Sequence, residues 1–164
     1  MDRIQLSENF YLDEFTRSQT AERLGIDMSV EVGSDVFNNL RRLCVVVLQP
    51  LRDAMGPVTV SSGYRPPSLN MAIGGATTSQ HIAGLAGDVT VTGYTPLDVC
   101  RWILDNVTGY DQLIHEFGRW CHVSVAALGD LPRMEDFTSY RDPHLKKTVY
   151  MHGLFTLAEA VRRA

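Results

Sequence analysis

Two histidines and an aspartate have the types and spacing of metal ligands. His81 is separated from Asp88 by six residues, Ile-Ala-Gly-Leu-Ala-Gly, which are all small or apolar. Gly84 and Gly87 permit a tight turn, so the imidazole and the carboxylate could meet at one ion. Zinc accepts both ligand types at about 2.0–2.2 Å, and a catalytic zinc takes a third protein ligand while leaving one position open for water.

The third ligand is predicted from the segment CHVSV, which reads as a strand. Side chains alternate between the two faces of a strand, so His122 and Ser124 should share one face and Cys121 the other. His122 is therefore the expected third ligand. The same alternation argues against a competing interpretation, in which Cys121 is a nucleophile activated by His122.

A general base is also needed, and Glu116 is the candidate. If Gly118 to Trp120 form a three-residue hairpin loop, Glu116 and His122 become cross-strand partners with Cβ atoms about 4.5–5.5 Å apart. A two-residue loop would instead pair His115 with His122. The sequence leaves both loop lengths open.

Two further side chains are candidates for holding a substrate. Arg65 ends the segment SSGYR, and its planar guanidinium could bind a substrate carboxylate or polarise a scissile carbonyl, a catalytic as well as a binding role. Ser79 lies two residues before His81 and could donate to the same group.

Strand and helix patterns alternate along the chain and predict an α+β fold, in which helices flank a small, mainly antiparallel sheet with the zinc site at its surface. Residues 1–164 are expected to form one domain, since no linker or repeat interrupts them. The segment SSGYRPPSLN reads as a loop, and the part after Leu131 reads as solvated surface plus a last strand and helix. The expected helices are one over 34–55, capped by Ser34 or Asp35 and bent or split at Pro50, one that begins at Thr95 and one over 156–163. The expected strands cover 58–60, 88–92, 110–116, 121–126 and 147–151.

Composition limits the classes of function. The chain has 164 residues, 45% of them hydrophobic, so it can build a core without a structural metal. A net charge of -4 disfavours nucleic acid as a partner. Three widely spaced cysteines, an odd number, predict reduced thiols.

No segment has the apolar length of a membrane span, and the charged start of the chain does not have the pattern of a signal peptide. We therefore expect a protein that is made in the cytoplasm. The simplest expectation for its oligomeric state is a monomer.

Three segments in this order, SGYRPPSLN, SQHIAGLAGDV and WCHVSV, resemble the M15 family of zinc peptidases, which includes D-alanyl-D-alanine carboxypeptidases and phage endolysins. The segments NFYLDEFTRSQTAERLGI and LQPLRDAMG are also similar, so the resemblance covers most of residues 8–125. It implies that His81, Asp88 and His122 bind Zn²⁺ and that Arg65 engages the substrate. The implied substrate is a stem or cross-link peptide of peptidoglycan.

One position departs from the family pattern. Many members carry an acidic catalytic residue three positions before the last histidine ligand, where this chain has Arg119. Either Glu116 supplies the carboxylate, or the base is missing. The first case predicts a zinc-dependent carboxypeptidase or endopeptidase that reaches the cell wall after release, as a phage endolysin does, or in a virion. The second predicts an inactive zinc-binding module that binds cell wall or builds a phage particle.

Overall fold

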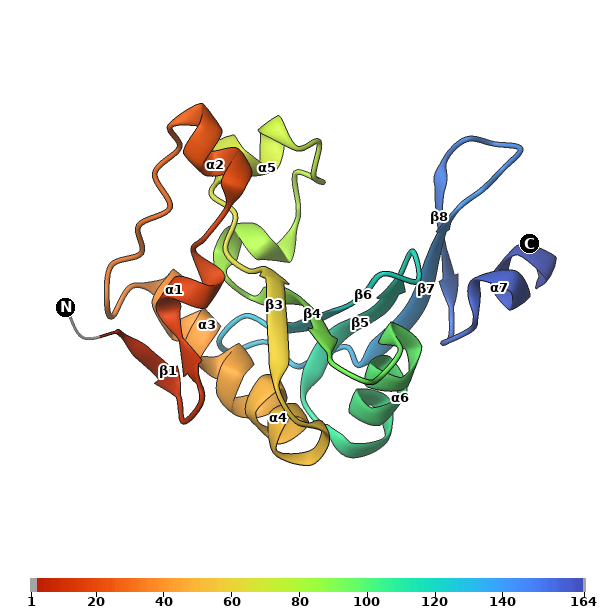
Figure 1. The fold of residues 1–164 in the computed structure, drawn as a ribbon, viewed down its shortest axis with the longest axis horizontal. Helices are drawn as coiled ribbons and strands as arrows, with labels where there is room; N and C mark the ends of the chain where they lie inside the picture. The colour runs from red at the N-terminus through yellow and green to blue at the C-terminus, as the bar shows by residue number, and fades with distance from the viewer. Residues whose placement is uncertain (1–2, 164) are drawn as a thin grey trace.

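A six-stranded sheet forms the centre of the structure, a computed structural model that describes residues 3–163 (Figure 1). All neighbouring strands are antiparallel except β5 and β7, which are parallel. The α+β fold with a mainly antiparallel sheet is thus confirmed. In spatial order the strands are β3 (Val58–Ser62), β4 (Ala86–Val91), β6 (Trp120–Val125), β5 (Tyr110–Glu116), β7 (Glu135–Arg141) and β8 (Thr148–His152).

One continuous helical segment covers a face of the sheet, in three parts: α3 (Asp35–Leu43), the π-helical η1 (Cys44–Leu48) and α4 (Gln49–Met55). Ser34 caps its start by accepting a hydrogen bond from the Phe37 amide, as the sequence predicts. Pro50 does not split it. The hydrogen bonds shift to the wider π pattern just before Pro50, which then lies in the first turn of α4, where no amide donor is needed.

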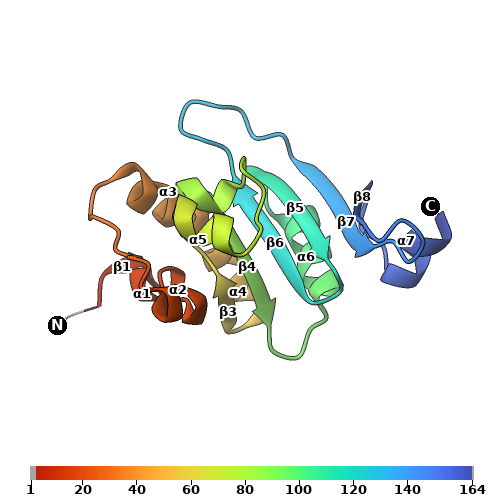
Figure 2. The same cartoon turned by 90° about the horizontal axis from the view of Figure 1, so that it is seen from above.

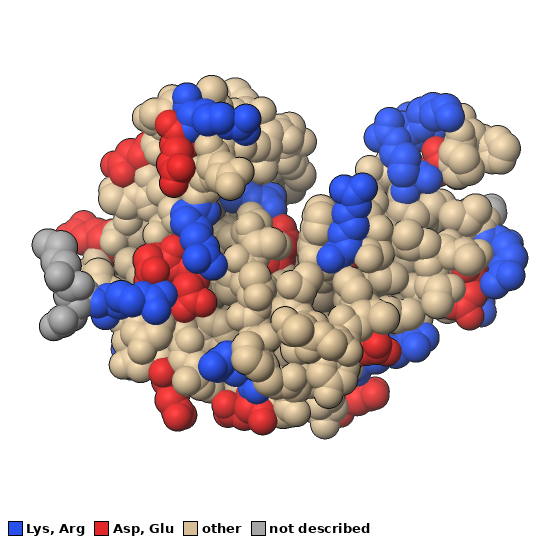
Figure 3. All heavy atoms as spheres, in the orientation of Figure 1, with Lys and Arg blue, Asp and Glu red and all other residues tan. Residues whose placement is uncertain are grey.

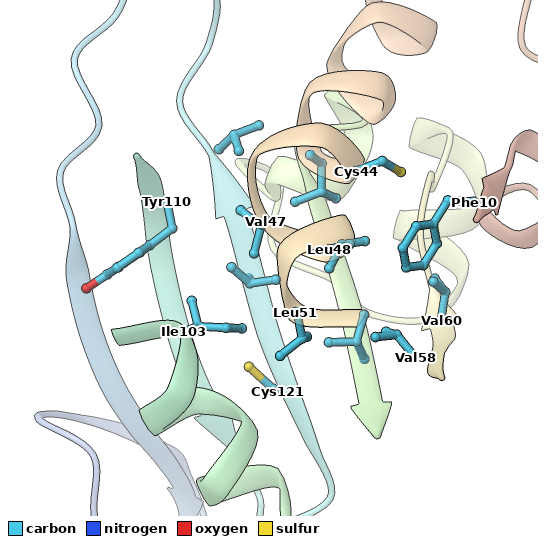
Figure 4. Packing of buried hydrophobic residues seen from close by; sticks show 14 of the residues in the cluster. Phe10, Cys44, Val47, Leu48, Leu51, Val58, Val60, Ile103, Tyr110 and Cys121 are labelled. Carbon is cyan, nitrogen blue, oxygen red and sulfur yellow. The ribbon is translucent and has the colours of Figure 1, made fainter. Parts of the chain in front are cut away.

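The hydrophobic core lies between these helices and the sheet. Val47 and Leu51 of the helical segment lie close to Cys121 of β6 (Figure 4). Leu43 and Val89 belong to the same cluster, and all five side chains are fully buried. Helix α6 (Pro96–Asn106) covers the same face beside β5, which Figure 2 shows from above. Because this face is filled with apolar side chains, polar groups on the central strands must lie on the opposite face.

The opposite face is bordered by shorter elements. An N-terminal arm consists of β1 (Gln5–Ser7), β2 (Phe10–Tyr11), α1 (Leu12–Phe15) and α2 (Gln19–Leu24), and packs on the end of β3. Two short helices, α5 (Pro67–Ala72) and the 3₁₀ helix η2 (Gln80–Ala83), belong to the segment that connects β3 to β4 along the chain. On the far side stands what we call the C-terminal arm, made of β7, β8 and α7 (Leu157–Arg163) (Figure 1).

Several of these elements differ from the sequence prediction. Helix α5 begins within the segment expected to be a loop, because Pro67 occupies its first turn, where proline is well tolerated. Strand β7 was not predicted, since its buried positions include the polar residues Thr138 and Ser139. No helix among residues 3–163 is both long and apolar enough to cross a membrane.

Candidate metal centre

Strand pairing places two of the three predicted ligands side by side. Asp88 of β4 is the cross-strand partner of His122 of β6, and His122 is the partner of Ile114 of β5. Cross-strand partners point to the same face of a sheet, here the face away from the core. The structure therefore brings the aspartate and the last histidine together through register alone.

The predicted pairing of Glu116 with His122 is wrong, and so is the alternative pairing of His115 with His122. Glu116 pairs with Trp120, and the hairpin loop consists of residues 117–119, one position earlier than expected. Phe117 and Gly118 adopt positive φ angles of 53° and 67°. This turn conformation ends the pairing of β5 with β6 at Glu116 and Trp120, and it sets the register of the two strands.

His81 completes a compact cluster of three donor atoms. His81 Nε2 lies 3.2 Å from Asp88 Oδ1 and 3.3 Å from His122 Nδ1, and the latter two atoms are 2.9 Å apart. Ligands of a tetrahedral zinc ion with bonds of about 2.0–2.1 Å are separated by about 3.3 Å. The triangle therefore has nearly the dimensions that zinc requires.

The backbone immediately after β3 orients the His81 ring. Its Nδ1 donates a hydrogen bond of 2.7 Å to the Gly63 carbonyl, which can only accept. A neutral ring that donates from Nδ1 has only a lone pair at Nε2, so this atom is free to bind a metal. Gly63 must be glycine, because a Cβ there would lie 2.7 Å from the Phe15 Cα atom. The N-terminal arm thus packs directly against the backbone that holds His81.

Burial and charge set the ionisation of the cluster. Burial lowers the pKa of His81, because the imidazolium form is poorly solvated there. Burial would raise the pKa of Asp88, but the adjacent His81 and His122 rings favour the ionised carboxylate more strongly, and the pKa lies well below its ordinary value. A neutral imidazole and an ionised carboxylate are the forms that bind a cation.

The donor set fits zinc. Two imidazole nitrogens and one carboxylate oxygen are the ligand types of catalytic zinc sites, and the three residues form the one group of this kind within residues 3–163. Cys121 is fully buried on the opposite face of β6, among the core side chains (Figure 4). Its sulfur is therefore directed away from the three donors, as the strand alternation predicts.

The three donors line a cleft of about 770 Å³. Figure 3 shows the surface hollowed between the part that contains α2 and α5 and the C-terminal arm. One side of the cleft consists of Arg65 and the segment 73–80, which includes Ser79. The other side is formed by the β5–β6 hairpin and the C-terminal arm. Among the described residues that line it, Asp88 and Glu116 are the two carboxylates.

Glu116 lies on the ligand face despite the changed register. It is two residues from Ile114, the cross-strand partner of His122, so Glu116 and His122 are diagonal neighbours with Cβ atoms about 7–8 Å apart. Trp120 donates a hydrogen bond of 2.9 Å from Nε1 to Glu116 Oε2. Arg119, at the position where the family pattern has its acidic residue, is exposed in the turn.

Arg65 contacts the ligand Asp88 directly. Its Nη2 donates to Asp88 Oδ2 at 2.6 Å, and its Nε donates to the Ser62 hydroxyl at 2.8 Å. The ion pair leaves Asp88 Oδ1 directed at the two histidines. Arg65 thus orients a candidate ligand, and it also lines the cleft.

The sequence analysis did not identify the residues that connect the site to the start of β7. Asp111 is buried and accepts hydrogen bonds from Gln80, next to the ligand His81, and from the Arg133 guanidinium and amide. Arg133 also pairs with Glu135 at the start of β7. No sequence motif marks Asp111 or Arg133. The alternation in YDQLIHE does, however, predict that Gln112, Ile114 and Glu116 share one face of the strand.

Comparison with known proteins agrees with this geometry. A family described as Peptidase M15 matches residues 8–124, which is more than half of the chain and includes all three candidate ligands, Arg65 and Glu116. The matched segment ends before the C-terminal arm begins. No curated protein matches the sequence.

Proposed function

The chain belongs to the peptidase M15 family, and we propose that it is a zinc-dependent peptidase whose metal ligands are His81, Asp88 and His122 and whose general base is Glu116. One observation carries this proposal. Three donor atoms converge at zinc-like spacing in a cleft where Glu116 is the one other described carboxylate.

Each residue has a distinct task in this mechanism. A zinc ion held by the three ligands would lower the pKa of a water molecule to about 7 and polarise the scissile carbonyl. Glu116 accepts the proton of the attacking water and later delivers it to the leaving amine nitrogen. Trp120 keeps the carboxylate in place through its hydrogen bond to Oε2. Arg65 holds Asp88 in its ligand orientation and, together with Ser79, borders the path of the peptide.

We further propose that the substrate is a stem or cross-link peptide of peptidoglycan, cleaved as a carboxypeptidase or endopeptidase. The resemblance of SGYRPPSLN, SQHIAGLAGDV and WCHVSV to cell-wall peptidases of the family supports this substrate. An open cleft of about 770 Å³ is large enough for several residues of an extended peptide. Action on the cell wall after release from the cytoplasm, or delivery in a virion, is part of the same proposal.

Digestion of purified peptidoglycan, followed by mass analysis of the released fragments, tests this function. The zinc-loaded protein should release fragments cut at a peptide bond, and Glu116→Gln should retain zinc and release them at least about 100-fold more slowly. The alternative, an inactive wall-binding or phage structural module, was suggested by Arg119. It would be supported if the zinc-loaded protein bound peptidoglycan without cutting it, which would refute the enzymatic function.

A further inference from the structure

The ligand face of the sheet extends beyond the metal centre into the C-terminal arm. Strand pairing continues the row of partners Asp88, His122 and Ile114 to Phe137 of β7 and then to His152 of β8. A second row, two residues further along β5, links Glu116 to Ser139 and then to Tyr150. Phe137 and Tyr150 therefore lie on the same face as the metal ligands, and both line the cleft.

Tyr150 lies on the same face as Glu116, two strands away, with a small residue between them. Ser139 lies between them in the row and is fully buried, so its short side chain leaves the space above it to the two longer ones. Partial burial raises the pKa of the Tyr150 hydroxyl, and the negative charge of Glu116 raises it further. The phenol is thus close enough to the proposed base to respond to its charge.

The rings of Phe137 and His152 form a pair on the strands that also carry Tyr150. Their ring centroids are 4.4 Å apart with an angle of 37° between the planes. This contact fixes the Phe137 ring at the edge of the cleft. Phe137 is half-buried and Tyr150 is 54% exposed, so both present ring surface to a molecule in the cleft.

The position of these rings distinguishes them from scattered surface hydrophobic residues. They border a concave site beside proposed catalytic groups and face Arg65 across the cleft. An aromatic side chain can bury a large area with little loss of conformational freedom, which suits it to binding. The family match ends at residue 124, so both rings lie outside the matched segment.

We propose that Phe137 and Tyr150 are substrate-binding residues that make the peptidase select peptides with a large ring-bearing group next to the scissile bond, such as the sugar to which a peptidoglycan stem peptide is joined. This inference rests on the proposed peptidase function and extends it to the preference for one class of peptide. The rings contact the flanking group of the substrate and not the reacting atoms. Their removal should weaken binding while the chemical step keeps its rate.

Phosphinic dipeptides, which place a metal-binding group where the scissile bond would be, provide the test. Two matched series would carry either a phenylalanine-type or a glycine side chain, first on one flank and then on the other. We expect the zinc-loaded protein to bind the bulky compound about tenfold more tightly than its glycine partner at one flank. Tyr150→Ala and Phe137→Ala should each lose most of this preference, whereas Tyr150→Phe should retain it.

Leu145→Ala is the matched control, because Leu145 is a similarly exposed apolar residue of the β7–β8 hairpin that does not line the cleft. It should bind like the unmodified protein. The inference is overturned if the bulky and glycine compounds bind equally at both flanks, or if Tyr150→Ala and Phe137→Ala both keep the full preference. A protein that shows the preference but leaves peptidoglycan intact would refute the cell-wall substrate and support the selective surface.

Discussion

The three candidate metal ligands and the cleft-lining side chains of the C-terminal arm lie on the same face of one sheet, but they are held in place differently. His81, Asp88 and His122 are buried and held by strand register, a backbone carbonyl and the Arg65 ion pair. The cleft-lining side chains of the arm are more exposed and are held by ring stacking and one ion-pair cluster. Rigid central strands therefore suit chemistry, and edge strands added beside them suit the choice of substrate.

The largest expected effect is the loss of metal from the centre. His81→Ala and His122→Ala each remove one of three ligands, so zinc content measured by atomic spectroscopy should fall from about one equivalent per chain to near zero. Peptide cleavage should vanish with it. The metal site lies outside the hydrophobic core, so the fold should persist without zinc. The far-ultraviolet circular dichroism spectrum should therefore be unchanged. Full zinc content in either variant would refute the proposed ligand set.

Replacing the base should separate chemistry from metal binding. Glu116→Gln keeps the shape of the side chain and removes its ability to accept a proton, so kcat should fall by about 10²–10⁴ while zinc content is retained. Trp120→Phe, which removes the hydrogen bond to Oε2, should lower kcat by roughly tenfold. Equal kcat values for Glu116→Gln and the unmodified protein would assign the base elsewhere.

Arg65 should affect the affinity for metal more than the fold. Arg65→Lys cannot bond Asp88 and the Ser62 hydroxyl in the same geometry, so the zinc dissociation constant should rise by about 10–100-fold. Competition with a chromogenic chelator measures this constant. An unchanged constant combined with a raised KM would show that Arg65 acts on substrate alone.

The smallest predicted effect concerns the link between centre and arm. Asp111 is buried, and Arg133 holds its pKa below the ordinary value although burial opposes this. Asp111→Asn should lower the free energy of unfolding by about 1–3 kcal/mol, a range that takes account of the half-exposed Arg133.

The contribution of Asp111 also has a defined pH dependence. The unfolded chain takes up a proton at a higher pH than the folded one, so the stabilisation is present at neutral pH and is lost as the pH falls below about 4. Urea unfolding at pH 7 and pH 3.5 should show a smaller difference between Asp111→Asn and the unmodified protein at the lower pH. The same difference at both values would contradict the ion-pair argument.

The central part of the site was predictable because its signals are local. Strand alternation in CHVSV and the small residues between His81 and Asp88 were sufficient to anticipate the cluster that the structure shows. The cap at Ser34 is a local signal of the same kind. Such patterns depend only on the period of a strand or the chemistry of a turn.

The remaining features depend on contacts between distant segments. The predicted partner of His122 was wrong by two residues, Glu116 in place of Ile114, because the loop begins one position earlier than expected. The positive φ angles of Phe117 and Gly118 set this turn, and Phe117 does not signal such an angle from sequence. Strand β7 was missed because its residues pair with β5 residues 23 positions away and because it has buried polar positions. The ion pair of Arg65 with Asp88 likewise joins residues 23 positions apart.

Anomalous diffraction at the zinc absorption edge, on crystals grown with zinc, tests the central claim most directly. We predict a single strong peak in the cleft, within about 2.0–2.2 Å of His81 Nε2, Asp88 Oδ1 and His122 Nδ1. Glu116 Oε1 should lie within hydrogen-bond reach of a water on the open side of that peak. A peak at other side chains, or no peak at these three atoms, would contradict the account.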